Sequence, residues 1–281
     1  NSFLQKWEKF DQNSLSISDA VDYRLLGSLL SRVIWELDIM RSWERDASFW
    51  VDQALGPYMD VLLDPNEFSE ERATLAVKSL EDVPAIFSEA SSSLENSAVA
   101  PFASAVIEQL SSGVDIRGGN FPDIGERISM STSALENHIP KKLHRRLSEA
   151  SDKAGDAAEE FKNWLESRLS SMKKETAVGE KVFIWFLRNV SLMHESPKEL
   201  VEGSRREYCR SLVWEKLSEH QSSSEPLPPL PASAKRQCEI EEEDEHSIRE
   251  FYVQNRLLSQ PDNLGHYLNA PIPDYLSPVG F

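Results

Sequence analysis

Apolar residues recur at helical spacing along most of the chain. The clearest stripe begins near Asp19 and repeats every four residues, at Val21, Leu25, Leu29, Val33 and Leu37. Further apolar residues widen it, at Leu26, Leu30 and Ile34. A stripe this broad predicts an amphipathic helix that packs on other helices, with Ser18 or Asp19 capping its start.

The same spacing predicts further helices over residues 49–63, 69–80, 101–110, 140–172, 178–190 and 197–220. Pro84 is expected to end one helix or open the next, whereas Pro101 suits a first helical turn. The 140–172 helix is expected to be the longest, and the 178–190 helix to be buried. A last helix runs through Phe251, Leu257 and Leu258. Strand signals are scarce, so the predicted fold class is all-α: a multi-helix bundle or array with an extended, proline-containing C-terminal tail.

Composition divides the chain into three parts. Residues 1–221 form the predicted helical domain, and residues 222–238 are rich in Ser and Pro, as in an exposed loop. Residues 239–281 combine an acidic helix with the extended tail. The acidic run at 239–245 is typical of a solvated helix start, and the alternative is a site for a cation or a basic partner.

Charge and composition exclude several classes of function. With 30 Lys and Arg against 47 Asp and Glu, the net charge is −17, which disfavours nucleic-acid binding. The longest apolar runs, such as 182–187, are far shorter than the roughly 20 residues of a membrane span. Two cysteines provide no disulfide framework, and the polar start lacks an apolar leader, so a cytoplasmic location is expected. Within this acidic chain the 139–174 region is locally basic, and docking on an acidic partner surface is a possible use of that face.

Histidine provides the first candidates for chemistry. His194-Glu195 resembles the start of a zinc-binding H-E-x-x-H helix, but Lys198 occupies the position of the second histidine. His138 and His144 are expected in the basic surface around Lys141. The other three histidines are expected to be solvated or, for the last, to have a ligand or contact role: His220, His246 and His266.

Other catalytic patterns are also missing from the sequence. Neither Cys209 nor Cys238 has a histidine neighbour, which favours buried structural thiols. Gly118-Gly119 lacks the residues of a phosphate-binding loop, and adjacent carboxylate pairs such as Glu159-Glu160 are typical of a solvated helix face. The residues by themselves therefore assign no catalytic, cofactor-binding or metal-ligating position.

Several segments, in order, resemble one family, known as domain of unknown function 885. Residues 22–26 (DYRLL) and 43–50 (WERDASFW) resemble its helix and R-D-P-x-x-Y-type segment, with Ala47 and Trp50 as departures. Residues 72–76 (RATLA), with Leu80, Val83-Pro84 and Leu94, resemble a second pattern. Residues 178–188 (VGEKVFIWFLR) and 196–203 (SPKELVEG) resemble the G-E-x-x-F and T-P-E-E-L signature, and residues 267–278 resemble its proline-punctuated segment.

This resemblance implies a function that the residues alone do not reveal. Members of the family resemble helical zinc hydrolases related to the thermolysin-like metallopeptidases. In these members an H-E-x-x-x-H-type zinc helix and a glutamate ligand follow the region that the present chain resembles. The chain is therefore expected to be the non-catalytic N-terminal half of a peptidase- or amidase-like hydrolase, forming one wall of the substrate cleft. Zinc would belong to a missing catalytic half or companion chain, and the tail would pack on the helical domain or on that half.

Two alternatives remain open at this point. The chain could be a stand-alone helical interaction module without activity, which predicts a monomer with no exposed apolar patch. It could also be an enzyme whose site is assembled from residues scattered along the sequence. Substrate and oligomeric state do not follow from the sequence.

Overall fold

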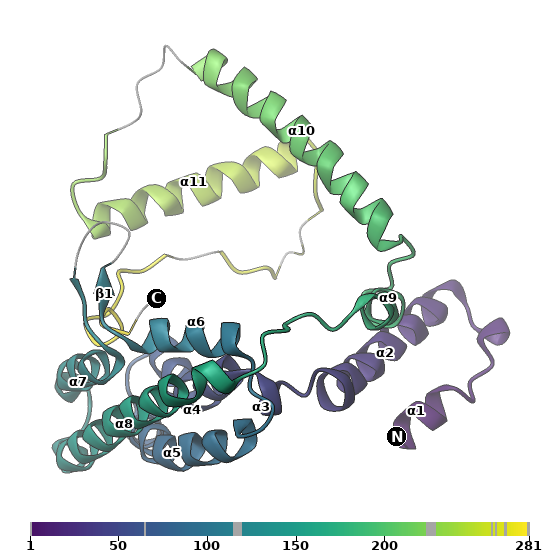
Figure 1. Cartoon of the computed structure of the whole chain (residues 1–281). Helices are drawn as coiled ribbons and strands as arrows, with labels where there is room; N and C mark the ends of the chain where they lie inside the picture. Colours follow the sequence, from purple (N-terminus) through teal and green to yellow (C-terminus); the bar gives the residue numbers. More distant parts are fainter. Residues whose placement is uncertain are drawn as a thin grey trace.

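The computed structural model shows a helical bundle from which two groups of helices extend (Figure 1). It describes residues 2–64, 66–114, 120–222, 229–259, 261, 263–266 and 269–279. Helices α4 to α8 form the bundle, α2 and α9 lie together at one side of it, and α10 and α11 project from it as long separate helices. The all-α prediction is confirmed.

The elements follow one another with short connections. The N-terminal part contains α1 (Ser2–Trp7), a 3-10 turn (Gln12–Ser14), α2 (Ile17–Ile34), a π-helical segment (Trp35–Met40) and α3 (Ser42–Arg45). The bundle contains α4 (Ala47–Leu63), α5 (Glu70–Leu94), α6 (Ala100–Leu110), α7 (Ile124–Leu135), a 3-10 turn (Glu136–His138), α8 (Lys141–Arg168) and a 3-10 turn (Leu169–Ser171). The remaining helices are α9 (Glu180–Asn189), α10 (Pro197–Ser222) and α11 (Ala234–Gln254). Two short strands, β1 (Gly113–Val114) and β2 (Asn120–Phe121), pair antiparallel with Gly113 opposite Phe121.

The longest helix, α8, lies at the centre of the core. Its buried residues recur three or four apart, as the sequence predicts: Leu143, Leu147, Ala150, Ala154, Ala157, Phe161 and Leu165. The Phe161 ring stacks on Phe87 of α5 with the ring centroids 4.7 Å apart. One stripe of α8 thus packs against both α5 and α7, and burial of this stripe stabilises the bundle.

Helices α7 and α8 approach each other closely at a pair of glycines. A β-carbon built on Gly155 of α8 would lie 3.1 Å from the Cα atom of Gly125 of α7. The neighbour is backbone, so it cannot turn aside as a flexible side chain would. Glycine at this position is therefore a packing requirement.

The C-terminal tail returns to the bundle. Tyr275 and Val279 are buried in the core, and the Ser131 hydroxyl of α7 donates to the Tyr275 carbonyl oxygen at 2.6 Å. The hydroxyl of Tyr58 in α4 lies 3.0 Å from the Ser131 oxygen, and burial raises the pKa of Tyr58 to about 12. A buried polar chain therefore connects α4, α7 and the tail.

Helix α5 corrects one boundary prediction. It runs without interruption through Pro84, although a proline inside a helix removes one hydrogen bond and costs about 3 kcal/mol. The buried positions keep helical spacing on both sides of the proline, at Leu80, Val83, Phe87, Ala90 and Leu94. Packing of this continuous apolar face outweighs the local penalty.

Other corrections concern helix ends and burial. The cap of α2 is Ser16, whose hydroxyl oxygen accepts from the Asp19 amide, two residues before the earlier of the two predicted caps. Only Leu187 of α9 is buried, so the prediction of a buried helix there is wrong. Helix α11 ends at Gln254, before Leu257 and Leu258. Of the predicted loop at 222–238, residue 222 and residues 234–238 are helical, and residues 223–228 lie outside the described residues.

The glycine contact predicts the effect of Gly155→Ala. Alanine normally favours a helix interior, but the added methyl group must push α7 and α8 apart, so we expect the free energy of unfolding to fall by about 1 to 3 kcal/mol. Urea unfolding followed by circular dichroism measures this. The matched control is Gly203→Ala in α10, where the nearest atom to an added β-carbon is the Arg206 guanidinium at 3.9 Å. If Gly155→Ala were as stable as this control, the glycine contact would not limit the packing.

Candidate functional site

The segment between α3 and α4 is a tight turn built by residues of the WERDASFW sequence. The Asp46 carboxylate caps α4 by accepting from the Ser48 amide at 2.9 Å. The indole of Trp50 is buried and donates to the Trp43 carbonyl oxygen at 2.8 Å. These contacts fix the turn and so hold Arg45, the last residue of α3, in one place.

Arg45 connects this turn to two distant segments. Its carbonyl oxygen accepts from the Val99 amide at 3.0 Å, and its guanidinium donates to the carbonyl oxygens of Thr176 at 3.0 Å and Glu175 at 3.4 Å. Val99 and Lys173 form an isolated parallel bridge beside it. Three parts of the chain, near residues 45, 99 and 175, therefore meet around one arginine.

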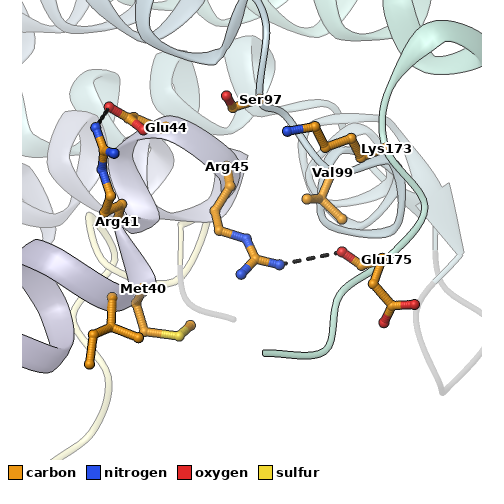
Figure 2. Close-up of a pocket in the computed structure, with 9 residues that line it drawn as sticks. Met40, Arg41, Glu44, Arg45, Ser97, Val99, Lys173 and Glu175 are labelled. Atoms are coloured by element: carbon orange, nitrogen blue, oxygen red, sulfur yellow. Dashed lines mark hydrogen bonds and ion pairs between the residues drawn. The ribbon is translucent and has the colours of Figure 1, made fainter. Parts of the chain in front are cut away.

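These segments enclose a small open pocket of about 240 Å³, which we call the cationic pocket (Figure 2). Its lining residues are Ile39, Met40, Arg41, Glu44, Arg45, Ser97, Val99, Lys173 and Glu175.

The cationic pocket carries an excess of positive charge. Arg41 is paired with Glu44, whereas the Arg45 guanidinium contacts main-chain oxygens and the carboxylate of Glu175 is turned away from it (Figure 2). Within the described part of the chain, Lys173 has no ion-pair partner. In a chain of net charge −17, such a pocket suits an anionic group such as a carboxylate.

An apolar face runs along α2 and ends next to the cationic pocket. Five of its side chains are more than half exposed: Val21, Leu25, Leu29, Val33 and Leu37. Part of this face borders an open cavity of about 430 Å³ lined by Phe3, Leu4, Leu30, Val33, Ile34, Leu37 and Asp38. The next residue, Ile39, lines the cationic pocket, so the π-helical segment lies between the two cavities.

Helix α9 packs on α2 but leaves the apolar face open. Trp35 is buried against Trp185 and Phe186 of α9, with ring centroids 6.3 and 4.6 Å apart. The Ser28 hydroxyl donates to the Val190 carbonyl oxygen at 2.6 Å. Contiguous exposed apolar side chains are uncommon on monomeric proteins and mark contact surfaces.

Two other segments that carry the family resemblance have structural roles at helix ends. The buried guanidinium of Arg72 donates to carbonyl oxygens at the end of α4, including those of Val61 at 2.9 Å and Asp64 at 2.7 Å. At the start of α10, Ser196 and Glu199 form a capping box, and the hydrogen bonds from Ser196 hold the pKa of Glu199 below its usual range.

His138, His144 and His194 lie in separate places. His194 and Glu195 lie in the connection before α10 rather than on a helix. His138 does not join the basic surface of α8; its ring contacts Asp274 of the tail at 3.0 Å and packs edge-on against Tyr275. His144 contacts the Ile139 carbonyl oxygen at 3.2 Å. Gly118 and Gly119 lie outside the described residues.

The basic residues of α8 face an acidic surface within the same chain. Lys142, Arg146 and Arg168 pair with three carboxylates of α5 and its end: Glu70, Glu81 and Glu95. These ion pairs account for much of the local positive charge that the sequence shows there.

Two features differ from the sequence prediction or were missed by it. Cys209 is exposed and Cys238 half-buried, so the prediction of buried thiols is wrong.

Glu245, His246 and His266 come together although 20 residues separate the last two. The hydrogen bond from His266 and then that from Arg249 lower the pKa of Glu245 to about 2. No sequence spacing marks this cluster, because the tail folds back to form it.

Comparisons with known proteins identify the family. The model of the family described as "Bacterial protein of unknown function (DUF885)" matches residues 1–211, so the chain belongs to this family. The search of curated proteins and the search of solved structures found no significant match. The match covers α1 to α9 and part of α10. Among the described helices, none is both long and apolar enough to cross a membrane.

The contacts of Arg45 predict the effect of Arg45→Ala. Loss of the two guanidinium hydrogen bonds should release residues 173–178, increase hydrogen exchange of their amides, and lower the free energy of unfolding by about 1 kcal/mol. Exchange mass spectrometry measures the first effect and urea unfolding the second. Arg41→Ala is the control, because it removes only the exposed pair with Glu44 and should cost less than about 0.5 kcal/mol. Equal exchange in the two variants would contradict a special role for Arg45.

Proposed function

We propose that this chain is the non-catalytic helical half of a zinc-dependent hydrolase that acts on peptide-like or amide substrates. In this proposal the apolar face of α2 docks the catalytic half, which belongs to the same polypeptide or to a companion chain. The cationic pocket then lies at the edge of the substrate cleft. The chain belongs to the DUF885 family, and the resemblance of that family to zinc hydrolases supports the proposal.

The observation that carries the proposal is the amount of exposed surface. The chain exposes 19,617 Å², whereas a compact monomer of 31.9 kDa exposes only about 12,000 Å². Helices α2, α10 and α11 carry large exposed apolar side chains such as Leu29, Trp214 and Phe251. Burying such surface releases free energy, which favours a partner that covers it.

The excess surface also distinguishes the two main hypotheses. A stand-alone interaction module predicts a monomer without an exposed apolar patch. The open face of α2 and the exposed side chains of α10 favour the half-enzyme instead. An interaction module remains the alternative if the partner carries no catalytic residues.

The catalytic zinc of this proposal is assigned to the partner half. A zinc helix of the H-E-x-x-H type needs two histidines one turn apart on one helix face. His194 precedes α10 and Lys198 occupies the second position, so this pair does not fit such a site. What this chain contributes is shape and charge: Arg45 and Lys173 offer positive groups to a substrate carboxylate.

The docking role of α2 predicts the effect of the double substitution Leu25→Asp with Leu29→Asp. The chain is mixed with a segment of a family member that carries the zinc-binding helix, and the dissociation constant is measured by sedimentation. Two charges in the buried contact should weaken association by at least about 100-fold, and zinc-dependent peptide hydrolysis should fall with it. Circular dichroism should stay unchanged, because both side chains are exposed in the chain alone.

The control is Leu75→Asp, which places the same charge on an exposed leucine of α5 away from α2. It should leave association unchanged. The proposal is wrong if the wild-type pair binds no zinc and hydrolyses no peptide. The docking surface alone is wrong if the pair is active but the α2 variant associates as tightly as the control.

A further inference from the structure

The C-terminal tail crosses α11 at a site fixed by Arg249. The Arg249 guanidinium donates to the Gly265 carbonyl oxygen at 3.1 Å and to that of Leu264 at 3.4 Å. The same guanidinium binds one oxygen of Glu245, one turn earlier on α11. The arginine therefore holds the next tail residue, His266, beside the side chains of Glu245 and His246.

Three potential metal ligands meet where the tail crosses. His266 Nδ1 lies 2.7 Å from Glu245 Oε2, the oxygen that Arg249 does not bind. His246 Nδ1 lies 3.6 Å from that same oxygen, and the two imidazole rings stack with centroids 4.3 Å apart and planes 12° apart. One ligand atom from each of the three residues lies within 4.8 Å of the others.

We propose that Glu245, His246 and His266 bind one divalent transition-metal ion, with Zn²⁺ as the expected ion, and that the ion fastens the tail to α11. This site is separate from the catalytic zinc proposed for the partner half. It does not depend on that proposal.

The spacing of the three residues suits such an ion once the two stacked imidazoles rotate out of their parallel arrangement, because a metal lies in the plane of each ring that it binds. Zinc binds histidine nitrogen and carboxylate oxygen at about 2.0 to 2.2 Å, so two ligands of a tetrahedral ion lie roughly 3.3 Å apart. The distances between the ligand atoms here range from 2.7 Å, between His266 Nδ1 and Glu245 Oε2, to at most 4.8 Å. Rotation of exposed imidazoles can supply the difference without moving the helix.

The surroundings prepare the ligands for a metal. His246 Nδ1 lies 2.8 Å from the Glu242 carbonyl oxygen, which can only accept, so in the neutral ring Nε2 keeps its lone pair. Metal-binding histidines commonly use their other ring nitrogen in this way. The Glu245 side chain is only 16% exposed, and Arg249 holds its other carboxylate oxygen in place. An open depression lined by His246 and three acidic residues of α11, Glu239, Glu242 and Glu243, adds negative potential for a cation.

The ligand types select the class of ion. Two imidazoles with one carboxylate favour zinc, nickel or copper, whereas magnesium and calcium prefer sites made only of oxygen ligands. Acidic residues alone would attract magnesium as well as zinc. Competition between the two ions therefore separates a specific site from general attraction by the acidic helix.

The test is calorimetric titration of the full chain, made without a histidine tag, with Zn²⁺ in the presence of excess Mg²⁺. We expect one tight Zn²⁺ per chain that Mg²⁺ does not displace. His266→Ala and Glu245→Gln should each weaken it at least about tenfold. Matched controls are His194→Ala, an exposed histidine in another segment, and Glu250→Gln, an exposed carboxylate on the same helix, and both should leave the affinity unchanged.

A structural readout shows where the ion binds. Zn²⁺ should slow hydrogen exchange of residues 263–266 in the wild-type chain and leave it unaltered in His266→Ala. The proposal is overturned if Mg²⁺ displaces the zinc, if His266→Ala binds as tightly as the wild-type chain, or if the controls lose as much affinity as the ligand variants.

Discussion

The packing of α8 against α5 and α7 is the interaction on which the rest of the structure depends. It fixes the bundle through one continuous apolar stripe and through the close contact of Gly125 with Gly155. Helix α5 buries residues on both sides of Pro84, and the helix continues through this proline. The end of α8 then leads to Lys173, whose bridge to Val99 brings residues 175 and 176 within reach of Arg45. The cationic pocket is thus a consequence of how the bundle packs.

The features that the family resemblance marks serve mainly to fix turns. Asp46 and Arg72 cap the two ends of α4, and Ser196 with Glu199 caps α10. Such residues fix the ends of the helices and thereby the direction of the segments that follow them. In the function proposed above, these same residues would hold one wall of the cleft in shape for the half that supplies the chemistry.

The sequence predicted what depends on local pattern and missed what depends on distant contacts. The burial of Leu147, Phe161 and Leu165 follows from helical spacing, and Pro101 does open α6. The path of α5 through Pro84 and the weak burial of α9 could not be predicted, because packing partners decide both. The cationic pocket and the cluster of Glu245 with His266 join segments 21 to 130 residues apart, so no local spacing reveals them.

The proposed function requires that a catalytic half cover the apolar face of α2. The most direct test is the mass of the protein isolated from its native source, measured under denaturing and native conditions. We expect a polypeptide well above 31.9 kDa, or a second, different polypeptide that stays bound under native conditions. A single species of 31.9 kDa under both conditions, or one that pairs only with itself, would contradict it.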